Sequence, residues 1–159
     1  CAELAEQHYN SKEFITAALL HDIGHLLHGG DDPTTRGVDA KHENLAADYL
    51  SQYFTDEVTV PIRAHVSSKR YLVSTVEGYY DSLSEASKIS LEDQGGPFTS
   101  EEADKFINKT HMKEAVKLRK YDDLAKVANK LTPTIEHFQH YVENSIKQYK
   151  NKFKNLFFD

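Results

Sequence analysis

The sequence predicts a single all-α domain that folds as a helical bundle. Apolar residues recur at helical spacing in nearly every informative segment. Strand signals are poor, because β-branched residues are scattered and rarely alternate with polar ones. The 159 residues, with 39% hydrophobic and 28% charged content, are enough for one domain with one sizeable core.

The expected helices follow one another along the whole chain. Residues 1–8 have the pattern of a helix end, and 13–28 form the most apolar stretch, which we expect to be a central buried helix. Gly29 to Pro33 should stop that helix, and a polar loop should run to about residue 39. The remaining helical segments are 40–53, 56–66, 68–73 (a short helix or a turn), about 82–92, 100–107, 112–127 and 134–153.

Charge and cysteine content exclude several classes of protein. The net charge of −6 argues against a nucleic-acid or anionic-membrane surface. No apolar run approaches the roughly 18 residues that a membrane span needs. A single cysteine leaves no internal disulfide, so a reducing compartment and a cytoplasmic location are expected. The sequence carries no signal of an oligomeric state.

The adjacent pair His21-Asp22 indicates a metal site. Neighbouring helical residues point about 100° apart, so the pair can present ligands to two sides of a site, or bridge two metals, more easily than chelate one ion. A single His on an apolar helix is more often a core residue than a ligand. A carboxylate inside AALLHDIGH, however, would cost several kcal/mol if it were buried without a partner. A cation beside Asp22 is therefore expected.

Three further candidate ligands lie on other predicted helices. His42, His65 and Asp122 can complete the site only if the bundle packs their helices together. Mixed imidazole and carboxylate ligation suits iron, manganese or zinc rather than calcium.

The string AALLHDIGH at 17–25 resembles the signature of the HD-domain superfamily, all-α metalloproteins that are mostly phosphohydrolases. More of the chain resembles one branch, the mixed-valent di-iron oxygenases that break the carbon–phosphorus bond of hydroxylated organophosphonates. The segments that carry this resemblance are HENLAADYL at 42–50, HVSSKRYLV at 65–73, LSEASKISLEDQGGP at 83–97 and LRKYDD at 118–123. Within them, KRYLV and QGGP are far more specific than the HD pair.

The resemblance implies a buried di-metal site that holds two iron ions, Fe(II) and Fe(III), with O2 as co-substrate. The implied metal ligands are His21, Asp22, His42, His65 and Asp122, with Asp22 as the bridge. The family pattern has one more His, which would fall before Cys1. We therefore expect that the printed sequence lacks the N-terminal helix of its HD domain. His8 is too close to the HD pair to replace that ligand.

The resemblance also implies a small-molecule phosphonate substrate and the residues that contact it. These are His25, Lys69, Ser87 and Arg119, to which Ser90 is added because it lies one helical turn from Ser87. His25 follows His21 by four residues and is expected to reach the substrate from the same helix face, acting in catalysis with His21 and Asp22. Fixed cations and neutral donors of this kind suit a phosphonate.

The expected reaction is cleavage of a 1-hydroxy-2-aminoethylphosphonate to glycine and phosphate. A trimethylammonium relative would instead give glycine betaine. Asp31, Asp32 and Asp39 could face the amine, although a solvated loop is the more usual role for such residues. Gln94 could shape a loop over the site, or simply belong to a turn.

Two other functions remain open at this point. One is a metal-dependent phosphohydrolase that acts on a nucleotide or phosphate ester, in which the metals activate water. The KRYLV and QGGP strings favour the oxygenase over it. The other is a degenerate HD domain that only binds a phosphonate or nucleotide, against which the presence of Asp22, Lys69 and Arg119 argues.

Overall fold

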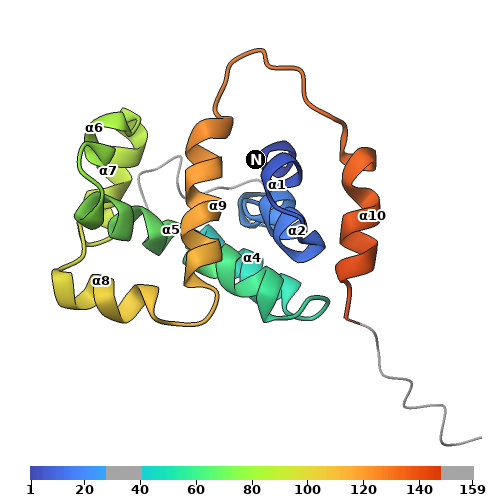
Figure 1. The fold of residues 1–159 in the computed structure, drawn as a ribbon, viewed down its shortest axis with the longest axis horizontal. Helices are drawn as coiled ribbons and strands as arrows, with labels where there is room; N and C mark the ends of the chain where they lie inside the picture. Colours follow the sequence, from blue (N-terminus) through green and yellow to red (C-terminus); the bar gives the residue numbers. More distant parts are fainter. Residues whose placement is uncertain (28–40, 148–159) are drawn as a thin grey trace, which may run out of the picture.

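The computed structural model of the protein describes residues 1–27 and 41–147, and over this part of the chain it is helical, which confirms the predicted all-α class. Apart from the helices there is one isolated β-bridge, between Phe54 and Ile146. The helices are α1 (Ala2–His8), α2 (Lys12–Leu20), α3 (Gly24–Leu27), α4 (His42–Leu50), α5 (Asp56–Thr75), α6 (Tyr79–Ser82), α7 (Glu85–Asp93), α8 (Ser100–Ile107), α9 (Met112–Ala125) and α10 (Ile135–Ser145) (Figure 1).

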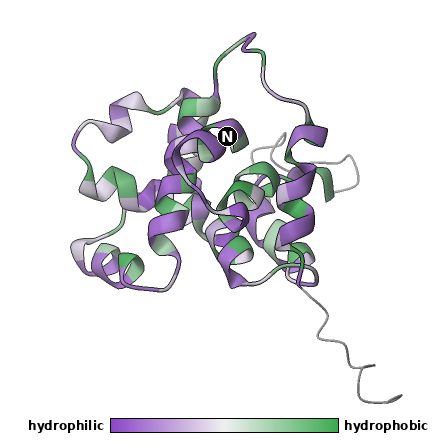
Figure 2. Ribbon diagram, turned by 45° about the vertical axis from the view of Figure 1, so that its right-hand side comes forward, coloured by the Kyte–Doolittle hydropathy of each residue, from purple (hydrophilic) through white to green (hydrophobic). Residues whose placement is uncertain are grey.

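Helix α5 lies at the centre of the bundle and contacts α2, α4, α8 and α9. In Figure 1, α6, α7 and α8 lie on one side of α9, and α1, α2 and α10 lie on the other. Three apolar clusters join these helices. The first includes Phe14, Leu118 and Phe138; the second includes Ala46, Leu50 and Ile62; the third includes Ala64, Phe106 and Met112. Most helices carry both hydrophobic and hydrophilic stretches (Figure 2), as expected when one face of each is buried.

The central helix predicted at 13–28 is wrong in one respect, because it is two helices. Helix α2 ends at Leu20, and α3 begins at Gly24 after a three-residue turn. In this turn the backbone hydrogen bonds join residues three apart rather than four. Ile23 N–H donates to the Leu20 carbonyl (3.1 Å) and His25 N–H to the Asp22 carbonyl (3.0 Å). A Cβ atom at Gly24 would lie 2.0 Å from the carbonyl oxygen of His42. The glycine therefore permits α3 to pack directly on the start of α4.

Helix α5 is longer than expected. The segments predicted at 56–66 and 68–73 form one continuous helix, Asp56–Thr75. Ser68 lies near the expected break, and its hydroxyl donates a hydrogen bond to the carbonyl of Ala64 (2.8 Å). This polar side chain therefore has a hydrogen-bond partner within the continuous helix. His65 and Lys69 are consequently one turn apart on one rigid element.

The two most specific strings of the sequence, KRYLV and QGGP, are in contact. Arg70 Nε donates to the carbonyl of Gly96 (2.6 Å) and Nη2 donates to that of Gly95 (3.1 Å). The guanidinium also lies 4.4 Å from the centre of the Phe98 ring. Gly95 and Gly96 have φ values of 92° and 67°, a left-handed backbone that favours glycine. Arg70 therefore holds the end of α7 against α5.

The other boundaries are close to expectation. Thr99 and Glu102 form a capping box at the start of α8. Helix α9 ends two residues before its predicted end, and the short helix α6 was not predicted. Helix α10, predicted at 134–153, is Ile135–Ser145, and residues 148–153 of that prediction lie outside the described residues. Across residues 1–27 and 41–147, every helix is too short or too polar to cross a membrane.

Candidate metal centre

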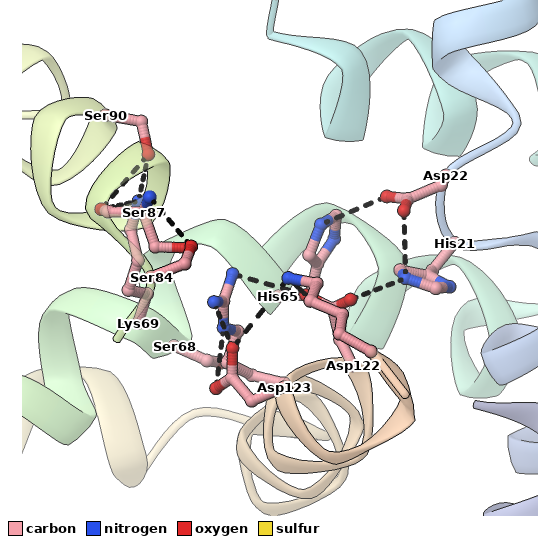
Figure 3. A network of polar contacts seen from close by, with 12 residues as sticks. His21, Asp22, His65, Ser68, Lys69, Ser84, Ser87, Ser90, Asp122 and Asp123 are labelled. Carbon is pink, nitrogen blue, oxygen red and sulfur yellow. Dashed lines mark hydrogen bonds and ion pairs between the residues drawn. The ribbon is translucent and has the colours of Figure 1, made fainter. Parts of the chain in front are cut away.

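Five predicted ligands from four parts of the fold converge at one place. The turn between α2 and α3 supplies two neighbours, and α4, α5 and α9 supply one each; all but the residue from α4 are labelled in Figure 3. They are His21, Asp22, His42, His65 and Asp122. Their ligand atoms form two groups of three that could each hold a metal ion, with Asp22 in both groups.

The first donor group is Asp22, His42 and His65. The Nε2 atoms of His42 and His65 lie 3.3 Å apart. Asp22 Oδ1 lies 3.6 Å from the first of these atoms and 3.7 Å from the second. Two atoms that each lie about 2.1 Å from a shared metal ion are roughly 3.0–3.5 Å apart in octahedral or tetrahedral geometry. The group is therefore only slightly wider than a loaded site.

The second donor group is His21, Asp22 and Asp122. His21 Nε2 lies 3.3 Å from Asp22 Oδ2 and 3.7 Å from Asp122 Oδ1. This nitrogen is buried and makes no hydrogen bond with the described residues. A buried polar atom without a partner is costly, and an ion between the two carboxylates would satisfy it.

Asp22 faces the two groups with different oxygens. Oδ1 lies toward His42 and His65, whereas Oδ2 lies toward His21. This is the geometry of a carboxylate that bridges two ions. The expected burial of Asp22 is wrong, because its side chain is 51% exposed. The helix ends before it, so the carboxylate projects from a turn while His21 is buried.

The rings of two candidate ligands are oriented by backbone carbonyls. His21 Nδ1 lies 3.1 Å from the carbonyl oxygen of Ala18, and His65 Nδ1 lies 2.7 Å from that of Ile62. A carbonyl only accepts, so Nδ1 carries the proton in both rings. Each Nε2 is thereby left as the atom that can bind a metal.

The electrostatics favour a positive charge between the carboxylates. Burial opposes protonation of His21, but Asp122 and Asp22 outweigh it and raise the pKa of this ring to about 9. Burial also opposes ionisation of both carboxyl groups, yet His21 outweighs it and holds the pKa of Asp22 and of Asp122 far below the usual value. In contrast, burial lowers the pKa of His65 to about 3, which keeps this ring neutral and able to ligate.

A second polar cluster joins α5 to α7. Lys69 is 2% exposed, and its Nζ donates to the carbonyl of Ser87 (3.1 Å) and to Ser90 Oγ (2.6 Å). Ser84 caps α7 by accepting from the Ser87 N–H (3.3 Å), and its hydroxyl donates to Ser87 Oγ (3.1 Å). Figure 3 shows these side chains gathered beside α7. The structure therefore brings together Lys69, Ser87 and Ser90, three of the predicted phosphonate contacts.

Arg119 lies beside the candidate ligand Asp122 on α9. Its Nη1 lies 3.4 Å from Asp122 Oδ2, three residues further along the same helix. Its Nε donates to Asp123 Oδ2 (3.2 Å), and Nη2 donates to the other oxygen of Asp123. Asp123 also accepts a hydrogen bond from the Tyr79 hydroxyl. The aspartate after the ligand, which the sequence analysis did not single out, thus orients the guanidinium.

Comparison with known proteins gives the family. The family model of the HD domain matches residues 1–150. This chain is a member of the HD-domain family. A dioxygenase of Leisingera caerulea, named for [1-hydroxy-2-(trimethylamino)ethyl]phosphonate and glycine-betaine formation, is 37% identical over 153 residues, which cover 93% of this chain and 76% of the relative.

A second relative has a different named substrate. The hydroxymethylphosphonate dioxygenase of Gimesia maris is 40% identical over 148 residues, which cover 92% of this chain and 74% of the relative. These relatives confirm the predicted branch of the HD-domain family and the assignment of the protein as an oxidoreductase.

His25 does not lie where the sequence predicted, on one helix face with His21. Because α2 and α3 are separate helices, His25 does not share a continuous helix face with His21. Its ring stacks instead on His42, with 4.0 Å between ring centroids and 20° between planes. His25 is thus beside the first donor group.

Four residues with possible roles beside the site remain, namely Asp31, Asp32, Asp39 and Gln94. Asp31, Asp32 and Asp39 lie outside the described residues of the HD domain. Gln94 is the C-cap of α7, and its Oε1 is buried with no hydrogen-bond partner in the described part of the chain. Its expected role over the site stays a prediction.

Proposed function

We propose that this HD-domain protein is a di-iron oxygenase that cleaves the carbon–phosphorus bond of a 1-hydroxy-2-aminoethylphosphonate, with either a primary or a trimethylated amine. The observation that supports it most is the place of Lys69. This cation is almost fully buried, points to two serines, and lies one helical turn from the candidate ligand His65. The arrangement offers a phosphonate a site beside two metal positions.

The donor set fits two iron ions. His42, His65 and Asp22 would hold one ion, and His21, Asp122 and Asp22 would hold the other. When bound, the irons supply the activation of dioxygen and Lewis-acid binding of the substrate hydroxyl. The protein contributes two imidazole rings that backbone carbonyls orient through Nδ1, with Nε2 toward the metal positions, and a carboxylate that is shared.

The phosphonate end has cations and neutral donors available. Lys69 supplies a buried ammonium, and the hydroxyl of Ser90 and the backbone carbonyl of Ser87 lie beside it. Arg119, which is 6% exposed, brings a guanidinium fixed by two aspartates. A buried, pre-oriented guanidinium binds a phosphonate oxygen pair with little loss of side-chain entropy.

The chemistry requires one dioxygen for each phosphate. The balanced reaction is an R–CH(OH)–phosphonate plus O2 giving R–COOH plus phosphate, in which both oxygen atoms enter the products. The carbon–hydrogen and carbon–phosphorus bonds break, and the carbon is oxidised to a carboxylate. The side chains above hold the phosphonate in place while this carbon reacts.

The test is to follow oxygen uptake and phosphate together. Full-length protein is loaded anaerobically with iron and given racemic 1-hydroxy-2-aminoethylphosphonate, and then its trimethylated relative. We expect no phosphate under nitrogen, and about one phosphate per dioxygen consumed after air is admitted.

Phosphate release without oxygen would contradict the oxygenase. Hydrolysis of a phosphate ester, with no turnover of any phosphonate, would support the phosphohydrolase instead. The faster of the two substrates identifies the amine that the protein prefers.

A further inference from the structure

We infer that Glu43 is a positioning residue for His42 and makes the two metal positions unequal in their affinity for metal. The inference rests on the proposed function, because it assumes that His42 holds a metal. Glu43 is 7% exposed, and its Oε2 lies 3.7 Å from His42 Nδ1. The carboxylate therefore lies on the side of the ring opposite to the ligand atom Nε2.

The position of His42 in its helix explains why a carboxylate lies there. His21 and His65 direct Nδ1 to the carbonyl three residues earlier, within or at the end of their own helices. His42, in contrast, is the first residue of its helix, α4. Glu43, the next residue of α4, brings a carboxylate within 3.7 Å of the same ring nitrogen, which is an ion-pair distance and too long for a hydrogen bond.

A short chain of polar contacts holds Glu43 in place. Asn44 Nδ2 donates to Glu43 Oε1 (3.1 Å), and Arg63 Nη1 donates to Asn44 Oδ1 (3.3 Å). Arg63 belongs to α5, and it is itself anchored by Asp48 at 2.5 Å. The contacts thus tie the start of α4 to α5, the helix that carries the other imidazole of this donor group.

The consequence is a difference between the two positions. A carboxylate on the far nitrogen of a ligating imidazole makes the ring more basic and fixes its tautomer. The His42 and His65 position receives this support from Glu43, whereas the ring of His21 at the other position has only a backbone carbonyl. Glu43 should therefore raise the metal affinity of the first position alone.

The test uses Glu43→Gln, which removes the negative charge and keeps the shape. Full-length protein is loaded anaerobically with Fe(II), and the release of iron to ferrozine is followed. We expect one of two iron equivalents to bind about 10- to 100-fold more weakly, and the other to change little. Glu57→Gln, the same change on an exposed residue of α5, is the matched control and should release iron like the wild type.

Two further variants separate positioning from folding. In a His42→Ala background, Glu43→Gln should cause no additional iron loss, because the ring on which it acts is gone. Asn44→Ala keeps the carboxylate and should weaken the same equivalent by a smaller factor. It provides the test if Glu43→Gln unfolds.

Unchanged affinity of both equivalents, or equal weakening of both, would overturn the role of Glu43. A wild-type protein that binds only one equivalent would contradict the dinuclear centre itself, and with it this inference.

Discussion

Replacing Asp22 with asparagine is expected to remove most of the metal from both positions and at least about 100-fold of the activity. The physical reason is that Asp22 is the only member common to the two donor groups, with one oxygen toward each. Loss of a partner that only orients a ligand already costs about 10- to 100-fold, and a shared ligand should cost more. Bound iron per chain and phosphate release are measured on the same sample.

The control for Asp22→Asn is Asp104→Asn, the same change on an exposed residue of α8. It should retain full metal content. If Asp22→Asn kept both irons with wild-type affinity, the carboxylate would not be the bridge.

Replacing Gly24 with alanine is expected to disrupt the first donor group although Gly24 binds no metal. The new methyl group would lie 2.0 Å from the carbonyl oxygen of His42, a backbone atom that cannot rotate away. Either α3 or the start of α4 must move, and overpacking of this kind costs about 1–3 kcal/mol or more. We expect a lower free energy of unfolding in urea, and loss of the iron that His42 would hold.

Gly78→Ala is the comparison for Gly24→Ala. It adds the same methyl group where nothing lies within 4 Å, at a φ of +74°. Its cost should be confined to local backbone strain, with metal content unchanged. A Gly24→Ala protein with normal iron content and stability would show that α3 and α4 do not need their close contact.

Much of the fold and of the site could be predicted from the sequence. Helical periodicity alone gave the class, and capping residues such as Thr99 located helix starts. The five candidate ligands were found because each lies in a string that resembles the family. Residues one turn apart lie on one face where the helix is continuous, as for His65 with Lys69 and for Arg119 with Asp122.

The break between α2 and α3 and the contacts of Glu43 and Asp123 were missed for a common physical reason. Periodicity cannot detect a three-residue turn such as that between Leu20 and Gly24, which keeps hydrogen bonds between residues three apart and begins at His21 with helical dihedral angles. The contact that accompanies it, between Gly24 and the backbone of His42, joins residues that are far apart in sequence. The sequence likewise offered no reason to distinguish Glu43 and Asp123 from acidic residues on a helix surface, because only the packing of the helices shows which side chains an acidic residue contacts. The one available signal was their position directly after a ligand.

The central claim is that two irons share Asp22, and electron paramagnetic resonance tests it most directly. Full-length protein loaded with Fe(II) is exposed briefly to air, and its iron content and spectrum are recorded together. The account predicts about two irons per chain and a signal from an Fe(II)/Fe(III) pair whose magnetic coupling leaves a single unpaired electron. One iron per chain, or only the signal of isolated high-spin Fe(III), would contradict it.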